Sequence, residues 1–165
     1  MKKILSVICL LSSFMIFSGC PYESDVPIDT SSMLLNTRMF GTWAAQNNKD
    51  ESFKISKHDE FTYSIEKVNK KSTDNEVEKY LAYGSTVNGE TFLNISDNNS
   101  DASSKKYFLY KMEMKNDGMM ILAEVTENID ERFTTSEELK KFIAANMKNS
   151  YFYIKDETTY IRIWK

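Results

Sequence analysis

The feature that most constrains the fold is a series of short segments in which apolar and polar residues alternate. The segment EFTYSIEKV, residues 60–68, is one example, and KYFLYKMEM, residues 106–114, is another. Alternation with a period of two is typical of a β-strand that buries one face. On the apolar face of the second segment lie Phe108, Tyr110, Met112 and Met114.

Turn signals separate these segments. Asn88-Gly89 lies between YLAYGSTV (80–87) and ETFLNIS (90–96), and Asp117-Gly118 lies between residues 106–114 and MMILAEVT (119–126). Both dipeptides favour tight hairpins, because a type I′ turn needs two residues that tolerate positive φ. The pattern therefore predicts antiparallel strands that follow one another along the chain.

One helix is predicted late in the chain, at about 135–148. A threonine before the segment can cap it, and Leu139, Phe142, Ile143 and Met147 form an apolar stripe at helical spacing. After the helix, YFYIKD (151–156) and TYIRIWK (159–165) are expected to form a C-terminal hairpin.

These elements favour a mostly β fold. We expect a single antiparallel up-and-down barrel of about eight to nine strands with one late α-helix, because closure removes the exposed strand edges. The predicted strands and helices do not alternate along the chain, as they would in a parallel sheet.

The N-terminus has the three parts of a secretory signal. Lys2 and Lys3 precede an apolar run from Ile4 to Phe17, and small residues follow directly before Cys20. The apolar run is short and interrupted by serines, which disfavours a membrane span of about 20 apolar residues. The alternative is an uncleaved N-terminal anchor helix.

Phe17-Ser18-Gly19-Cys20 resembles the lipobox of bacterial lipoproteins. The resemblance implies cleavage between Gly19 and Cys20 and attachment of lipid, including palmitate-type acyl chains, to Cys20. It implies a location in the bacterial cell envelope, anchored to a membrane, the outer membrane in preference to the inner. The only other cysteine, Cys9, lies in the segment that would be removed.

The expected organisation is a signal peptide at 1–19, a lipid-anchored tether at 20–37 and a barrel domain at 38–165. Both prolines, Pro21 and Pro27, fall in the expected tether and favour extended backbone. Removing residues 1–19, which carry two lysines and no acid, takes the formal net charge from −3 to −5. An acidic domain disfavours nucleic acid as a partner.

Gly41-Thr42-Trp43 resembles the G-x-W signature of lipocalin-like (calycin-like) barrels. In those families the tryptophan fills one end of the barrel, and an arginine from the last strand often covers it, a position that Arg162 matches. Alternation leaves its orientation open, because Arg162 shares a face with Tyr160 and Trp164, opposite Ile161 and Ile163. The alternative is a core tryptophan and a surface arginine with no mutual contact.

Two functions remain open. In the first, inward side chains line a pocket for a small apolar ligand or lipid, and the candidates are Tyr63, Phe108, Tyr110 and Met112. The same residues can instead fill the barrel completely. The chain would then be a packed interaction module of the envelope: an assembly factor, inhibitor or adhesin.

Catalysis has little support in the sequence. The single histidine, His58, lies in a polar turn, and no nucleophile motif or zinc spacing accompanies it. Asp97, Asn99 and Asp101 have the spacing of a calcium loop, but the glycine and bidentate glutamate that should follow are missing. We therefore expect no catalytic residue, no metal site and no cofactor.

Overall fold

The computed structural model of the chain describes residues 22–48, 50–69, 77–98, 105–126, 129–154 and 157–163. The expected signal peptide, Gly19 and Cys20 lie outside them. In chain order the described elements are β1 (Glu23–Ser24), η2, a short 3-10 helix (Thr37–Met39), β2 (Gly41–Ala45), β3 (Glu51–Lys57), β4 (Tyr63–Asn69), β5 (Val77–Val87), β6 (Glu90–Asp97), β7 (Tyr107–Asn116), β8 (Met119–Glu124), α1 (Ser136–Asn146), η3, a second 3-10 helix (Ser150–Phe152), and β9 (Thr158–Ile163).

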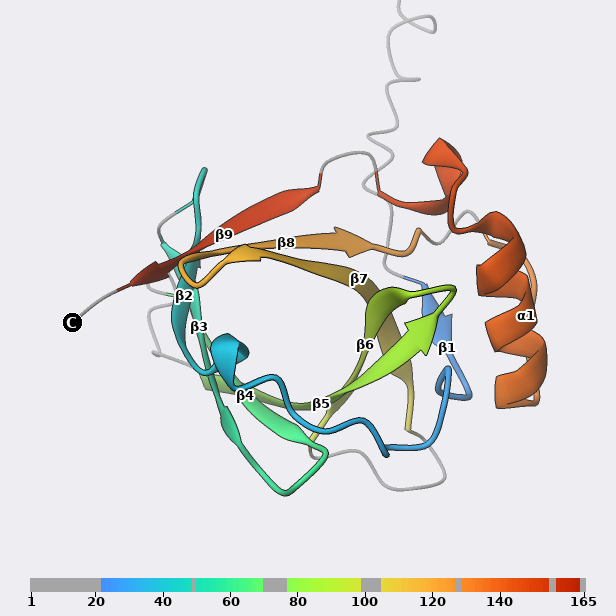
Figure 1. Cartoon of the computed structure of the whole chain (residues 1–165), viewed down its shortest axis with the longest axis horizontal. Coiled ribbons are helices and arrows are strands. Elements are labelled where there is room, and N and C mark those ends of the chain that lie inside the picture. Colours follow the sequence, from blue (N-terminus) through green and yellow to red (C-terminus); the bar gives the residue numbers. More distant parts are fainter. Residues whose placement is uncertain are drawn as a thin grey trace, which may run out of the picture.

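Strands β2 to β9 form a closed antiparallel barrel. Each strand pairs with the next along the chain, and β9 pairs with both β8 and β2. Figure 1 shows this ring, with β8 and β9 above, β2 and β3 on the left, and α1 outside it on the right. The predicted up-and-down barrel with one late helix is confirmed. The ninth strand, β1, pairs with the start of β7.

The two predicted hairpins are both present, but their turns differ. Asn88 and Gly89 have φ of 49° and 83°, as a type I′ turn requires. In the β7–β8 hairpin the strand register shifts between Met114 and Asn116, and the Asn116 side chain accepts a hydrogen bond of 2.8 Å from the Gly118 N–H. An Asx turn with a bulge therefore replaces a second type I′ turn.

The helix packs against the outside of the barrel. Thr135 caps it by accepting a hydrogen bond from the Glu138 N–H, as the sequence predicts. The apolar stripe of α1 faces an outer core that has the following buried members: Tyr22, Ile28, Val87, Phe92, Leu109, Val125, Ile129, Leu139, Ile143, Met147 and Phe152.

The structure corrects the expectation that residues 20–37 form a tether. Its described part, residues 22–37, lies against the barrel and is not a free linker. Ile28 is fully buried, and its N–H donates a 2.8 Å hydrogen bond to the side chain of the buried Asn94. Met33 lies against Gly84, at a position where glycine leaves room for it. Figure 1 shows this blue segment running from β1 across one end of the ring to β2.

The expected C-terminal hairpin is wrong. Both edges of β9 pair within the barrel, one with β2 and the other with β8, so no edge remains for residues 151–154, the described part of the expected strand. Phe152 is fully buried in the outer core, and Tyr153 forms an isolated bridge with Val125. Burial of Phe152 beside α1 holds this segment outside the barrel.

One end of the barrel is packed solid around Trp43. Its side chain is fully buried, and its indole N–H donates a 2.8 Å hydrogen bond to the Met39 carbonyl. Of the buried residues inside the barrel, those that pack at this end and do not line a cavity are Met39, Trp43, Tyr63, Ala82 and Met112. We call this the closed end.

Arg162 covers Trp43. The two residues are directly paired between β9 and β2, and the guanidinium carbon lies 4.5 Å from the centre of the indole ring. The guanidinium also donates to the carbonyls of Arg38, Phe40 and Asp117. Gly41, with φ of 134°, leaves room for it, since a Cβ there would lie 2.7 Å from an Arg162 nitrogen. Gly41, Trp43 and Arg162 thus meet at the closed end.

We predict that Arg162→Met destabilises the fold by about 2–4 kcal/mol, because it removes a cation–π contact and leaves carbonyls without their donor. The measurement is urea denaturation, with Lys57→Met, at an exposed position of β3, as the control. Equal denaturation midpoints for the two variants would contradict a closing role for Arg162.

Candidate functional site

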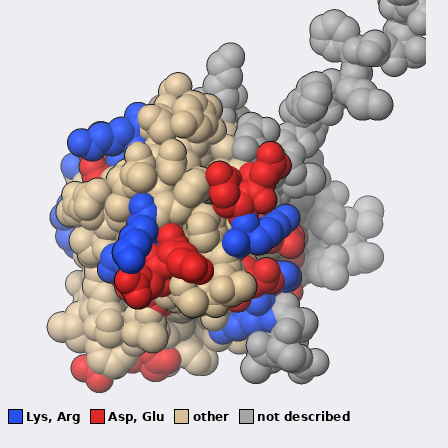
Figure 2. Space-filling model, turned by 90° about the vertical axis from the view of Figure 1, so that its right-hand side faces the viewer, with Lys and Arg blue, Asp and Glu red and all other residues tan. Residues whose placement is uncertain are grey.

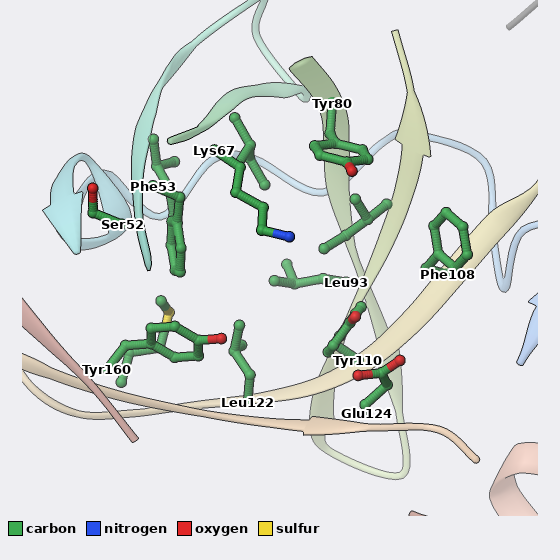
Figure 3. A pocket seen from close by; sticks show the side chains of 14 residues that line it. Ser52, Phe53, Lys67, Tyr80, Leu93, Phe108, Tyr110, Leu122, Glu124 and Tyr160 are labelled. Atoms are coloured by element: carbon green, nitrogen blue, oxygen red, sulfur yellow. The ribbon is translucent and has the colours of Figure 1, made fainter. Parts of the chain in front are cut away.

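The other end of the barrel encloses a cavity of about 370 Å³. Figure 3 shows side chains converging on it from the strands around the ring. Eight of the lining residues are apolar: Phe53, Ile55, Ile65, Leu93, Ile95, Phe108, Met120 and Leu122. The other six are Ser52, Lys67, Tyr80, Tyr110, Glu124 and Tyr160.

Strand register explains why these side chains share the interior. Phe53 is paired with Lys67, Ile65 with Tyr80, and Tyr110 with Glu124. Directly paired residues project to the same face of a sheet, so each polar side chain follows an apolar neighbour into the barrel. The cavity lies at the ends of β4, β6 and β8 and at the starts of β5, β7 and β9, which we call the open end.

Tyr110 and Glu124 form the polar wall of the cavity. Their side chains are hydrogen-bonded to each other. Burial raises the pKa of Glu124 above its usual range, although the Tyr110 hydrogen bond and the charge of Lys67 oppose the shift. Burial and the Glu124 charge also raise the pKa of Tyr110, so its hydroxyl keeps its proton and donates.

Lys67 brings a positive charge to the interior. Its ammonium group points into the cavity in Figure 3, between Phe53 and Tyr80. The Lys67 Nζ lies 3.7 Å from a carboxylate oxygen of Glu78, which is itself exposed on β5. The Tyr80 hydroxyl also donates to Glu78, and burial together with this contact raises the pKa of Tyr80 to about 12. An ammonium and a buried carboxyl thus face one apolar space.

A second hollow, of about 180 Å³, adjoins the first. Tyr110, Leu122, Glu124 and Tyr160 line both, and Ile154 and Thr158 line only the smaller one. Beyond the pairing of Leu122 with Thr158, β8 separates from β9, and the Ile154 N–H donates to the Glu124 carbonyl. The interior therefore extends toward the point where these two strands part.

The structure divides the four ligand-binding candidates of the sequence. Phe108 and Tyr110 line the cavity. Tyr63 and Met112 lie in the packed core, where the Tyr63 hydroxyl accepts a 2.7 Å hydrogen bond from the Asn36 N–H. The interior is thus filled at one end and hollow at the other.

Lys67 and Glu124 are functional candidates that the sequence analysis missed. The signal was present, because Lys67 continues the face of Tyr63 and Ile65, and Glu124 continues the face of Met120 and Leu122. Charged residues near strand ends are normally assigned to solvent, and only the closure of the barrel turns these two inward.

The other residues that the sequence analysis considered for catalysis or metal binding do not form a site within the described residues. His58 lies in the exposed turn between β3 and β4, where its backbone N–H donates to the Thr62 carbonyl. Asp97 ends β6, and Asn99 and Asp101 lie outside the described residues. Within the described ranges, no three His, Cys, Asp or Glu side chains gather as metal ligands do, and no helix has the length and hydropathy to cross a membrane.

Comparisons with known proteins give no family for this chain. No protein-family model matches it, and neither a curated protein nor a solved structure does. The eight-stranded antiparallel barrel is consistent with the lipocalin-like resemblance of Gly41, Trp43 and Arg162 at the level of architecture.

We predict that Glu124→Gln stabilises the protein at pH 8 and that the gain disappears near pH 4. A carboxyl whose pKa is raised by folding costs stability once it ionises, and the cost is absent where both states are protonated. Urea midpoints across this range measure it, with the exposed Glu113→Gln as the control. A gain of equal size at both pH values would contradict the buried-carboxyl interpretation.

Proposed function

We propose that this chain is a lipid-anchored, non-catalytic protein of the bacterial envelope that binds one small amphipathic molecule in its barrel. The observation that carries the proposal is the cavity, which combines eight apolar lining residues with Lys67, Tyr110 and Glu124. Ligand sites are typically concave and apolar, with a few polar groups that fix orientation.

The size of the cavity sets the size of the ligand. At about 370 Å³, it lies near the low end of the roughly 300–1,000 Å³ of small-molecule sites. It is more than twice the ~150 Å³ of an apolar cavity that takes benzene, and it has room for about a dozen atoms of the volume of a water molecule. A medium-chain fatty acid such as decanoic acid fits this volume.

The polar groups favour an anionic, hydrogen-bond-accepting head. The Lys67 ammonium is the inward-pointing positive charge in the described lining, and a ligand carboxylate can pair with it. The raised pKa of Glu124 reduces the repulsion between its side chain and such a head. On the opposite wall the Tyr110 hydroxyl donates to Glu124, so Lys67 is the side chain in the described lining that can pair with the head.

The anchor is supported by the sequence alone. A charged start, an apolar run and Phe17-Ser18-Gly19-Cys20 precede Tyr22, the first residue that the structure describes. A diacylglyceryl group on Cys20, with acylation of the new N-terminus, would give the several acyl chains that stable attachment needs. Such an anchor would hold the protein at a membrane of the envelope, the outer membrane by preference.

We predict that decanoic acid binds to the soluble form that starts at residue 21 and that Ile95→Trp weakens binding by about tenfold or more. The added indole occupies the space that the ligand needs, since Ile95 lines the cavity. Isothermal titration calorimetry measures the affinity. The matched control is Ile163→Trp, which places the same side chain at an exposed position of β9.

Lys67→Met tests the head group in the same assay. The substitution should weaken the binding of decanoic acid and leave the binding of decanol unchanged, because only the carboxylate of the acid pairs with the ammonium. If no form of the chain binds either compound, the cavity proposal fails, and the packed interaction module becomes the better hypothesis.

We predict that labelling with a radioactive fatty acid marks the full chain in bacteria and fails in Cys20→Ala. Lipid attachment in lipoproteins uses the cysteine thiol, and no other cysteine follows Cys20. Phosphorimaging of the protein after delipidating solvent extraction detects the bound label, with Cys9→Ala as the control that should keep it. Persistent labelling of Cys20→Ala would contradict the anchor.

A further inference from the structure

We propose that the bilayer to which the chain is anchored supplies the ligand, because the anchor holds the open end of the barrel at the membrane. This inference rests on the proposed function, since it assumes both a lipid on Cys20 and a ligand in the cavity. It adds the source of the ligand, the orientation of the barrel and the surface against which the open end lies.

The first described residues, Tyr22 and Glu23, are fixed at the open half of the barrel. Tyr22 is buried, and its N–H donates a 3.2 Å hydrogen bond to the carbonyl of Val125. Its hydroxyl donates to the Glu131 carbonyl, and the Arg132 guanidinium lies 5.8 Å from the centre of its ring. Arg132 also donates a hydrogen bond to the Glu23 carbonyl. Four contacts thus hold this end of the chain.

These contacts stand next to the cavity wall. Val125 directly follows Glu124, which lines both hollows. Glu23 is paired with Phe108, a lining residue of the larger cavity. The chain therefore joins the barrel beside the open end, and from there it runs along the barrel to cross the closed end.

The covalent distance to the anchor is short. Only Pro21 lies between Cys20 and Tyr22. A fully extended chain spans at most about 3.3–3.6 Å per residue, or roughly 7 Å over these two steps. The closed end lies at the opposite ends of the strands, and β7, which has ten residues, extends about 30 Å at the usual strand rise. An anchor at Cys20 therefore brings the open half of the barrel closer to the bilayer than the closed half.

A membrane source suits the ligand that the cavity selects. Molecules with an apolar body partition out of water, so the bilayer holds most of a single-chain amphiphile. On the side of the molecule that carries α1, acidic and basic side chains are interspersed (Figure 2), including the ion pairs of Lys140 with Asp29 and Lys141 with Glu137. Among the described residues, this face shows no single-sign patch to compete with the anchor in setting the orientation.

The first test measures orientation and needs no ligand. The full lipidated chain carries a fluorophore on Asn98→Cys at the open end or on Glu60→Cys at the closed end, both exposed positions, in phosphatidylcholine vesicles with brominated acyl chains. We expect quenching of the Asn98 label and little quenching of the Glu60 label. Equal quenching, or stronger quenching at Glu60, would overturn the proposal.

The second test measures whether the bilayer supplies the ligand. Radiolabelled decanoic acid is loaded into the vesicles, and its uptake by the anchored chain is compared with that of a chain carrying a twelve-residue Gly/Ser spacer between Pro21 and Tyr22. We expect the spacer to slow uptake by about tenfold, because the open end is no longer held near the surface, while affinity in the soluble form is unchanged. Equal uptake rates would overturn the membrane source alone. Failure of the soluble form to bind decanoic acid would overturn the proposed function, whatever the orientation result.

Discussion

The pairing of β9 with β2 is the constraint on which the rest of this structure depends. It turns a meander into a ring, and it brings Arg162 directly opposite Trp43. The same register places Tyr160 opposite Ala45, two residues further toward the open end. One strand pairing therefore sets both the closed end and one wall of the cavity. Because a small alanine lies beside Tyr160, the interior has space where Trp43 leaves none at the other end.

The lining of the cavity is costly for the fold, and this cost argues for a function. Glu124 lies where an apolar side chain would fill the barrel without burying a carboxyl, and the burial that raises its pKa carries this cost. At the closed end the same barrel uses Met39, Tyr63 and Met112, and the packing is complete. A chain that can fill one end and leaves the other open, with a buried carboxyl in its wall, departs from the stability optimum in the manner expected of binding sites.

The sequence predicts the parts of the fold that local chemistry determines. Alternation identifies most strands, Asn88-Gly89 sets one turn, and Thr135 caps the helix. Prediction from the sequence fails where long-range contacts determine the structure. Residues 22–37 are polar enough for a linker, yet Ile28 and Asn94, which are 66 positions apart, are hydrogen-bonded. Residues 151–154 have strand-like composition, but β9 has no free edge for them. Of the site, Phe108 and Tyr110 follow from alternation, whereas Lys67 and Glu124 need the closed ring.

Closure at one end limits what a cavity of this kind can do. Trp43 is fully buried beneath Arg162, and residues 33–40 cover the same end, so a ligand in the described barrel has no route through it. Whatever binds must therefore both enter and leave at the open half of the barrel. If that half lies at the membrane, a molecule taken from the bilayer returns to the same bilayer. Such a protein would hold or sense an amphiphile at one surface, and it would not carry the molecule between two membranes. The short distance between Cys20 and Tyr22 points the same way, because carriage across the envelope needs a body that can leave the surface on which it loads.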